Sequence, residues 1–225
     1  MKNFRKIPLI LLLFVPFALL SQDTIPEGYV KYTPAFKFKD GIYLNFLNVK
    51  NNQPIPKSQI VTKINYNSFD FYEKLFEEDV ISLYDNLGEK KEIKLSEIWG
   101  FSDKGVLYIN LNQEFNRIPV FGSISHFIAN KTYTDYDPYA YSRPYSAYNS
   151  YYYDQSNTKT ILMQYILDFD SGKIYDFNYK SVELLLSKDQ ELYEEFISMS
   201  KRKRKKLKFL YIRKYNKIHP VLLPK

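Results

Sequence analysis

The stretch "TILMQYILDFDSGKIYDF" (Thr160 to Phe177) decides the fold of this chain. β-Branched and aromatic residues fill the runs on both sides of Ser171-Gly172, and this pattern is typical of a tight β-hairpin. Asp170 and Lys173 would flank the turn as a cross-strand pair of opposite charge. We therefore predict that the two runs are neighbouring antiparallel strands.

The chain before this hairpin continues the strand pattern. From Val80 onward, short segments are separated by the Gly-containing turns "NLGEK" and "SDKG"; the segments are "VISLYD", "KEIKLSEIWGF", "VLYINL" and "RIPVFGSISHFI". Such spacing predicts an antiparallel meander. Further upstream, Ile42, Leu44 and Phe46 alternate with their neighbours as in a strand. The segment "SFDFYEKLFEEDV" has apolar residues at helical spacing and predicts a short helix with Ser68 as a cap.

The chain after the hairpin changes to a helical pattern. Apolar residues lie on two helical faces, Leu192, Phe196 and Met199 on the first and Leu207, Leu210, Tyr211 and Ile218 on the second. Ser187 and Gln190, three residues apart, fit a capping box at the start of a helix. Strands followed by helices indicate an α+β fold.

The fold that we predict is an antiparallel β-meander sheet or partly open barrel, with C-terminal helices and a long tyrosine-rich hairpin loop. Residues 22–180 would form the β-rich domain, with a low-complexity loop at residues 130–160. Residues 181–225 would form a basic helical segment packed on the same domain.

The tyrosine-rich loop is the most unusual part of the composition. Nine tyrosines lie between Tyr133 and Tyr153, among serine, proline and asparagine and almost without aliphatic residues. A connection of about 30 residues is far longer than a usual hairpin loop. Two interpretations stay open: a tolerated insertion, or a recognition loop for a glycan or protein, since tyrosine gives contact area at low entropy cost. The candidate binding residues are Tyr139, Tyr141, Tyr145, Tyr148, Tyr151, Tyr152 and Tyr153.

The N-terminus has the pattern of a secretory signal. Lys2, Arg5 and Lys6 precede an apolar run from Ile7 to Leu20, which is too short to span a bilayer comfortably. We predict a Sec-type signal peptide at residues 1–21, removed on export to the periplasm, the outer membrane or the cell exterior. An uncleaved N-terminal anchor is the alternative; after cleavage no transmembrane span is expected.

The net charge of +7 divides unevenly along the chain. Residues 1–21 contribute +3 and residues 201–225 contribute +11, which leaves −7 for residues 22–200. The basic segment "SKRKRKKLKFLYIRKYNK" is either solvated or docked on the acidic body, or it attaches to anionic lipid, lipopolysaccharide phosphate or an acidic glycan. Nucleic acid is not an expected partner of an exported chain. Lys203, Arg204 and Lys206 are the candidate contacts.

Several phrases in this order resemble an uncharacterised family of secreted proteins from the Bacteroidota: "FKDGIYLNFLNVKNNQPIP", "EIWGFSDKGVLYIN", "RIPVFGSISHF", "YILDFDSGKIYDF" and "FLYIRKYNKIHP". The resemblance covers nearly the whole mature chain. It implies an envelope or extracellular location and carries no activity and no functional residues.

Catalytic patterns are weak in this sequence. Without cysteine, thiol catalysis, thiolate zinc sites and disulfides are excluded. His126 follows Ser125 directly, so strand alternation would point the two side chains to opposite faces. We expect no catalytic residue, no metal and no cofactor, and a non-enzymatic envelope-associated binding or accessory protein. The alternative is a hydrolase acting on envelope polymers through a site near His126.

Overall fold

The computed structural model describes residues 25–85, 87–134 and 158–225, and its architecture is α+β, as predicted. Twelve strands in these residues form open antiparallel sheets, and the longer helices lie between the eleventh and the twelfth strand. The four-stranded sheet has the order β2 (Gly41–Tyr43), β6 (Gly100–Asp103), β7 (Val106–Leu111) and β8 (Glu114–Arg117). A three-stranded sheet joins β3 (Ile60–Val61), β4 (Val80–Tyr84) and β5 (Lys90–Lys94).

The predicted meander is confirmed for the pairs β4–β5 and β6–β7, but its segments divide among three sheets. The segment "RIPVFGSISHFI" becomes a strand only from Ile124, and this strand belongs to the third sheet and does not pair with β7. The segment "KEIKLSEIWGF" is interrupted by a 3₁₀ turn, η2 (Leu95–Glu97), so that β5 and β6 belong to different sheets. The side-chain amide of Asn110 holds this turn, because it donates to the carbonyl oxygens of Leu95 and Ile98 at 2.9 and 2.8 Å. At Gly100, the first residue of β6, a Cβ would lie 2.1 Å from the carbonyl oxygen of Tyr108 on β7, so only glycine fits at this position.

The predicted hairpin at Ser171-Gly172 is confirmed. The strands β10 (Thr158–Asp168) and β11 (Ile174–Asp176) pair antiparallel, and Gly172 adopts φ +74° in the turn between them. The predicted cross-strand pair of Asp170 and Lys173 is wrong, since both residues lie within the turn and Asp170 pairs with Lys188 instead, at 2.9 Å.

The longest ladder pairs β10 with β9 (Ile124–Thr134) over all eleven residues of each strand. The predicted loop limits of 130 and 160 are therefore too wide, because Asn130–Thr134 and Thr158–Thr160 are paired strand. The chain between the two strands, residues 135–157, lies outside the described residues, and with it the tyrosine-rich loop.

Two local predictions upstream are corrected. The expected strand at residues 42–47 ends at Tyr43 and is followed by a short helix, α1 (Phe46–Lys50). Asn45 caps that helix by accepting from the backbone N–H of Asn48 at 2.9 Å, and this local bond prevails over the alternating pattern. The second helix, α2 (Phe71–Leu75), forms as expected, but Asp70 rather than Ser68 occupies its N-cap position.

Three helices form the C-terminal layer: α3 (Tyr179–Leu186), α4 (Gln190–Ile197) and α5 (Lys201–Ile218). The predicted capping box is wrong, because Ser187 ends α3 and Asp189 begins α4 by accepting from the N–H of Leu192 at 2.9 Å. The buried residues of α5 are Tyr211, Ile212 and Tyr215. Leu210 and Ile218, predicted to share the apolar face, are 41% and 55% exposed.

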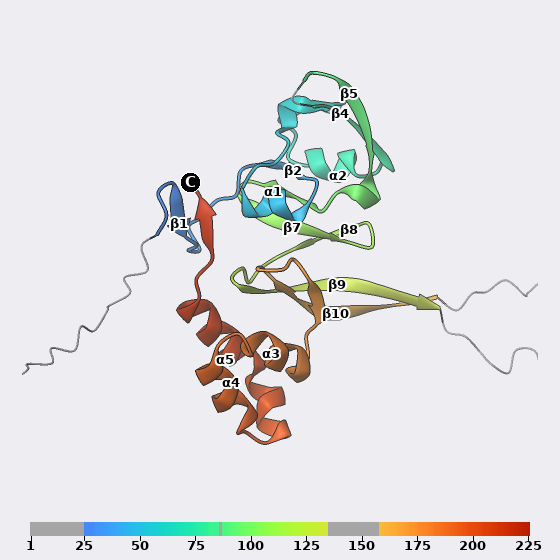
Figure 1. Cartoon of the computed structure of the whole chain (residues 1–225). Coiled ribbons are helices and arrows are strands. Elements are labelled where there is room, and N and C mark those ends of the chain that lie inside the picture. The colour runs from blue at the N-terminus through green and yellow to red at the C-terminus, as the bar shows by residue number, and fades with distance from the viewer. Residues whose placement is uncertain (1–24, 86, 135–157) are drawn as a thin grey trace, which may run out of the picture.

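The β9–β10 ribbon separates two hydrophobic cores. Ile124 and Ile166 on one face pack with α3, α4 and α5, whereas Phe127 and Leu167 on the other face pack toward the four-stranded sheet. Burying each of these large apolar side chains contributes roughly 1.5–3 kcal/mol. Figure 1 shows the resulting column, with β4 and β5 at one end, the ribbon in the middle and the helices at the other end.

The two ends of the described chain meet in a small sheet of their own. Here β1 (Tyr29–Lys31) pairs antiparallel with β12 (Leu222–Pro224). Val221, just before β12, and Leu223, within it, are buried in the core that contains Phe127.

Candidate functional site

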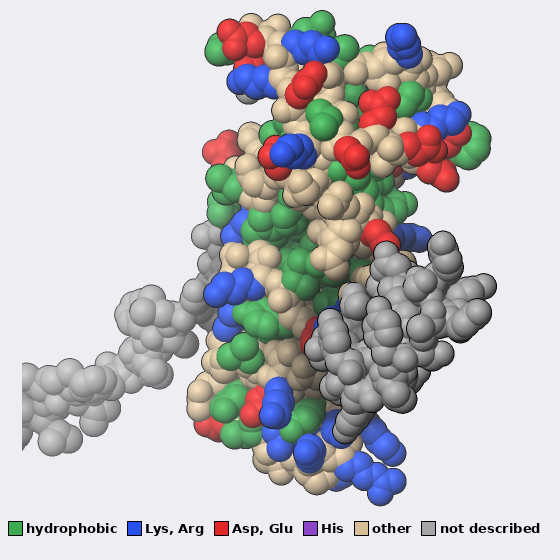
Figure 2. All heavy atoms as spheres, turned by 90° about the vertical axis from the view of Figure 1, so that its right-hand side faces the viewer, with side chains coloured by type: hydrophobic (Ala, Val, Ile, Leu, Met, Phe, Trp, Pro, Cys, Tyr) green, Lys and Arg blue, Asp and Glu red, His purple; other side chains and the backbone are tan. Residues whose placement is uncertain are grey.

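The most strongly charged surface lies on the outer side of α5. We call this surface the basic face; its members are exposed and comprise Arg202, Lys203, Lys206, Arg213 and Lys217. The spacing explains the grouping, since residues three, four, seven and eleven apart lie on one side of a helix. Figure 2 shows lysine and arginine side chains gathered at the end of the molecule that the helices form.

The side chains of the basic face have no anionic partner within the described part of the chain. Of the three predicted contacts, Lys203 and Lys206 belong to this face. Arg204 does not, because its guanidinium forms an ion pair with Glu183 and lies 5.3 Å from the ring centroid of Tyr179. Arg204 thus fastens α5 to α3.

Other cations of α5 also face inward and fasten the helix. The Nζ of Lys214 lies 2.7 Å from Glu195 on α4. The Nζ of Lys208 donates to the carbonyl oxygen of Phe177 at 3.2 Å and lies 3.9 Å from the centroid of its ring. Burial lowers the pKa of Lys208, and the positive charge of Lys205 lowers it further. The cations of α5 therefore have two roles: the inward ones hold the helix, and the outward ones stay available.

The start of α5 is electrostatically unfavourable in isolation. Its first turn contains no acidic residue and four consecutive cations, Lys201 to Arg204, although the N-terminus of a helix carries partial positive charge. Each such cation costs about 0.3–1 kcal/mol when exposed. A bound anion would relieve this repulsion.

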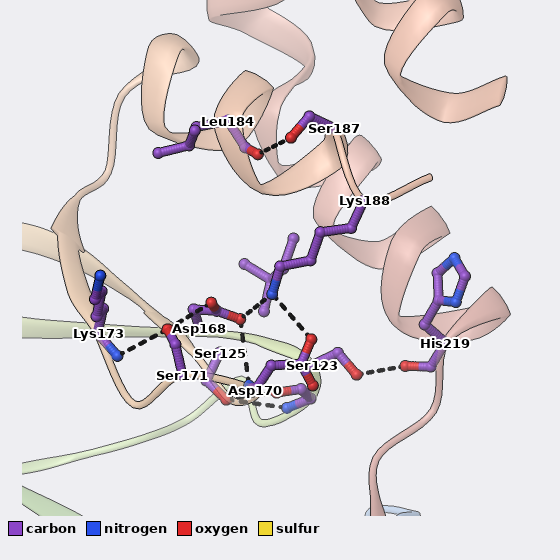
Figure 3. A network of polar contacts seen from close by, with 12 residues as sticks. Ser123, Ser125, Asp168, Asp170, Ser171, Lys173, Leu184, Ser187, Lys188 and His219 are labelled. Carbon is purple, nitrogen blue, oxygen red and sulfur yellow. Dashed lines mark hydrogen bonds and ion pairs between the residues drawn. The ribbon is translucent and has the colours of Figure 1, made fainter. Parts of the chain in front are cut away.

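A polar network fixes the base of the helical layer on the hairpin (Figure 3). The buried carboxylate of Asp168 accepts from Lys188 Nζ at 2.7 Å and from Ser171 Oγ at 2.6 Å. Burial alone would raise the pKa of Asp168, but the hydrogen bonds from Lys188 and Ser171 outweigh it and lower the pKa. At the end of α5, Ser123 Oγ donates to the carbonyl oxygen of His219 at 2.5 Å.

His219 links α5 to α4 through its ring. Its Nε2 lies 2.6 Å from the carboxylate of Asp189, the residue that caps α4. The hydrogen bond from the Leu192 N–H and the contact with His219 lower the pKa of Asp189. This network orients α5, and with it the basic face.

His126 lies in an aromatic pocket rather than beside a nucleophile. Its Nε2 is 3.1 Å from the amide oxygen of Gln164, and its ring packs edge-on against Phe177 and Phe209. Burial lowers the pKa of His126. The hydroxyl of Ser125 is occupied by the backbone of Gly122, from which it accepts at 3.1 Å and to which it donates at 2.9 Å. This geometry favours a structural role for the histidine.

The candidate tyrosines of residues 139–153 lie outside the described residues. Within residues 25–85, 87–134 and 158–225, no three His, Cys, Asp or Glu side chains gather as they would around a metal ion. No helix in the same part of the chain has the length and apolar character needed to cross a membrane.

A second surface feature, a groove beside α2, was not predicted from the sequence. An open groove of about 380 Å³ lies beside α2, lined by aromatic rings and carboxylates from α2 and from the four-stranded sheet. The alternation of Phe69, Phe71 and Phe76 with acidic residues in "SFDFYEKLFEED" is the local signal that could have indicated it.

No protein-family model, curated protein or solved structure matches this chain.

Proposed function

We propose that this chain is an exported, non-enzymatic binding or accessory protein of the bacterial cell envelope, held at an anionic surface by the basic face of α5. The observation that supports this proposal is the set of five outward cations without an ion pair in the described chain, on a helix whose inward cations Arg204 and Lys214 form ion pairs.

The dimensions of the basic face suit a flat, charged surface. Arg202 and Lys217 are fifteen residues apart, which is about 22 Å along the helix axis. Each lysine or arginine near an anionic membrane contributes about 1 kcal/mol of attraction. Leu210, on the same side of the helix and 41% exposed, could enter the headgroup region. Phosphate groups of lipid or lipopolysaccharide are the anions that we expect.

A vesicle-binding experiment tests the proposal. The mature protein should sediment with vesicles containing phosphatidylglycerol, not with neutral phosphatidylcholine vesicles, and binding should weaken from about 50 to about 500 mM salt. The variant Arg202→Gln/Lys206→Gln/Arg213→Gln should bind about 100-fold more weakly, since three contacts of about 1 kcal/mol are lost.

The matched control is Lys63→Gln/Lys90→Gln/Lys94→Gln, which removes the same charge from exposed positions near the other end of the column. Equal weakening by both triple variants would contradict a role for the basic face, because binding would then follow net charge alone. A parallel assay with lipopolysaccharide micelles distinguishes the two sources of phosphate.

Export is part of the same proposal and has its own measurement. We expect a mature N-terminus at or near Gln22, determined by mass spectrometry of the native protein. Retention of Met1 would contradict cleavage. The tyrosines of residues 139–153 stay a predicted second contact surface for a glycan or protein.

A hydrolase acting on envelope polymers is the less favoured function. It would need His126 beside a hydroxyl or carboxylate, whereas its Nε2 contacts the amide of Gln164.

A further inference from the structure

The groove beside α2 has a rigid aromatic floor. Phe76 stacks on Phe115 with ring centroids 4.1 Å apart, and Phe101 stacks on Tyr108 at 4.6 Å. The two pairs touch, since Phe76 and Phe101 are 5.0 Å apart. These rings come from α2 and its C-cap and from β6, β7 and β8, so the floor joins a helix to a sheet.

One aromatic residue of the groove is almost fully exposed and therefore contributes little to the hydrophobic core. Phe69 is 85% exposed, although it lines the groove with the packed rings. Leu87, in the β4–β5 turn, is the only other large hydrophobic side chain in the described chain with the same exposure. An exposed phenyl ring at the rim of an aromatic floor can close over a bound group.

The rim of the groove is acidic. Asp70, Glu73 and Asp103 line it, and no lysine, arginine or histidine does. The segment from Asp70 to Asp79 contains five acidic residues and one lysine. That lysine, Lys74, pairs with Asp70 at 2.8 Å, and this hydrogen bond raises its pKa. Glu73 is exposed and has no ion-pair partner among the described residues.

The protein already binds one of its own ammonium groups at this aromatic cluster. The Nζ of Lys57 lies 4.6 Å from the ring centroid of Tyr72 and 4.9 Å from that of Phe71. The same nitrogen is 3.2 Å from the carboxylate of Asp103. A cation held between aromatic faces and a carboxylate is a recurrent mode of recognition, because the face of the ring is negative.

We propose that this groove binds a lysine or arginine side chain from an extended basic segment of a partner protein. Glu73 is the free carboxylate that receives the cation, and Phe69 covers its stem. The acidic residues that continue to Asp79 receive further cations of the same segment. A neutral sugar suits the lining less well, because the lining offers carboxylate acceptors and no side-chain donor other than tyrosine hydroxyls.

The probe for this proposal is a blocked, fluorescein-labelled peptide of alternating arginine and glycine, measured by fluorescence anisotropy with the full mature protein. An alternating glutamate–glycine peptide is the negative probe. We expect Glu73→Gln to weaken binding of the arginine peptide about 10-fold, because a charge-assisted hydrogen bond is lost. Phe69→Ala should weaken it about 2- to 5-fold, because the ring that covers the bound side chain is lost.

Matched controls are available for both variants. Glu191→Gln removes an exposed carboxylate from α4 in the helical layer, and Leu87→Ala removes an apolar side chain as exposed as Phe69. All four positions are exposed, so circular dichroism and the melting temperature should match those of the unaltered protein. Both controls should bind the peptide like the unaltered protein.

Two results would overturn the assignment. If Glu191→Gln weakens binding as much as Glu73→Gln, the peptide follows the general charge of the acidic body and not the groove. If the protein alone associates with itself and Glu73→Gln abolishes this in sedimentation velocity, the occupant is a second copy of the chain. The inference does not depend on α5, so the vesicle experiment and the peptide experiment can fail separately.

Discussion

Replacing Lys188 by methionine isolates the contribution of the ion pair beneath the helices. Lys188 lies in the turn between α3 and α4, so the substitution leaves both helices intact. It removes the hydrogen bonds from Nζ to Asp168 and Asp170, at 2.7 and 2.9 Å, and leaves the Asp168 side chain, 6% exposed, without a cation.

The expected cost follows from the surroundings of that carboxylate. Breaking a buried pair typically costs about 3–5 kcal/mol. Here Ser171 Oγ and the backbone N–H of Asp170 still donate to Asp168, and Lys188 is 37% exposed, so water screens part of its charge. We therefore expect a loss of about 2 kcal/mol in the free energy of unfolding at pH 7. For a chain of this size that is about 4–8 °C in Tm.

The pH dependence gives the decisive control. Because the pKa of Asp168 is lowered in the folded state, its stabilising effect is present above the unfolded value of about 3.9 and is lost as the pH falls through the folded value. The difference between Lys188→Met and the unaltered protein should be complete at pH 7 and shrink below about pH 4. Urea denaturation at both pH values measures it. A loss under about 0.5 kcal/mol at pH 7, or an equal loss at both pH values, would refute this reasoning.

Three further predictions concern substitutions of single residues. Asn216→Ala should cost about 2 kcal/mol in urea denaturation, because the amide of Asn216 bonds both the N–H and the carbonyl oxygen of Ile124, at 2.8 and 2.9 Å. Burial lowers the pKa of His126, so below about pH 6.5 the unfolded chain takes up a proton more readily than the folded one, and stability falls with the pH. His126→Gln removes this titration and should flatten the fall in Tm between about pH 7 and 5. Gly100→Ala should lower Tm by more than about 5 °C, because its Cβ would meet the carbonyl oxygen of Tyr108.

Local chemistry made part of this fold predictable. The turn at Ser171-Gly172 and the strands β4 to β7 were recognisable because turn residues and alternation act over a few positions. The strand β8 was not predicted. The helix α1 was missed because one hydrogen bond from the Asn45 side chain decides against a strand pattern that looks equally good in the sequence. Leu210 was assigned to the wrong face because spacing alone does not show which side of a helix meets the sheet.

The sites depended on contacts between distant residues, which the sequence does not display. Asp170 was paired with its neighbour Lys173, but Lys188 reaches it from another element. Arg204 and Lys203 are equivalent in the sequence pattern, but only Arg204 forms an ion pair with Glu183 on α3. The groove needs α2 and the four-stranded sheet together.

The pairing of β1 with β12 has a consequence for the order of folding. Tyr29–Lys31 cannot complete their sheet until Leu222–Pro224 have been synthesised, and Leu223 is missing from the core that contains Phe127 until then. A contact between residues so far apart in sequence closes late, since the intervening chain must first be ordered. In a ribosome-bound chain this sheet would therefore stay unformed until Leu222–Pro224 emerge. For the proposed passage through a Sec-type channel, such a delay would keep the polypeptide unfolded enough to be translocated.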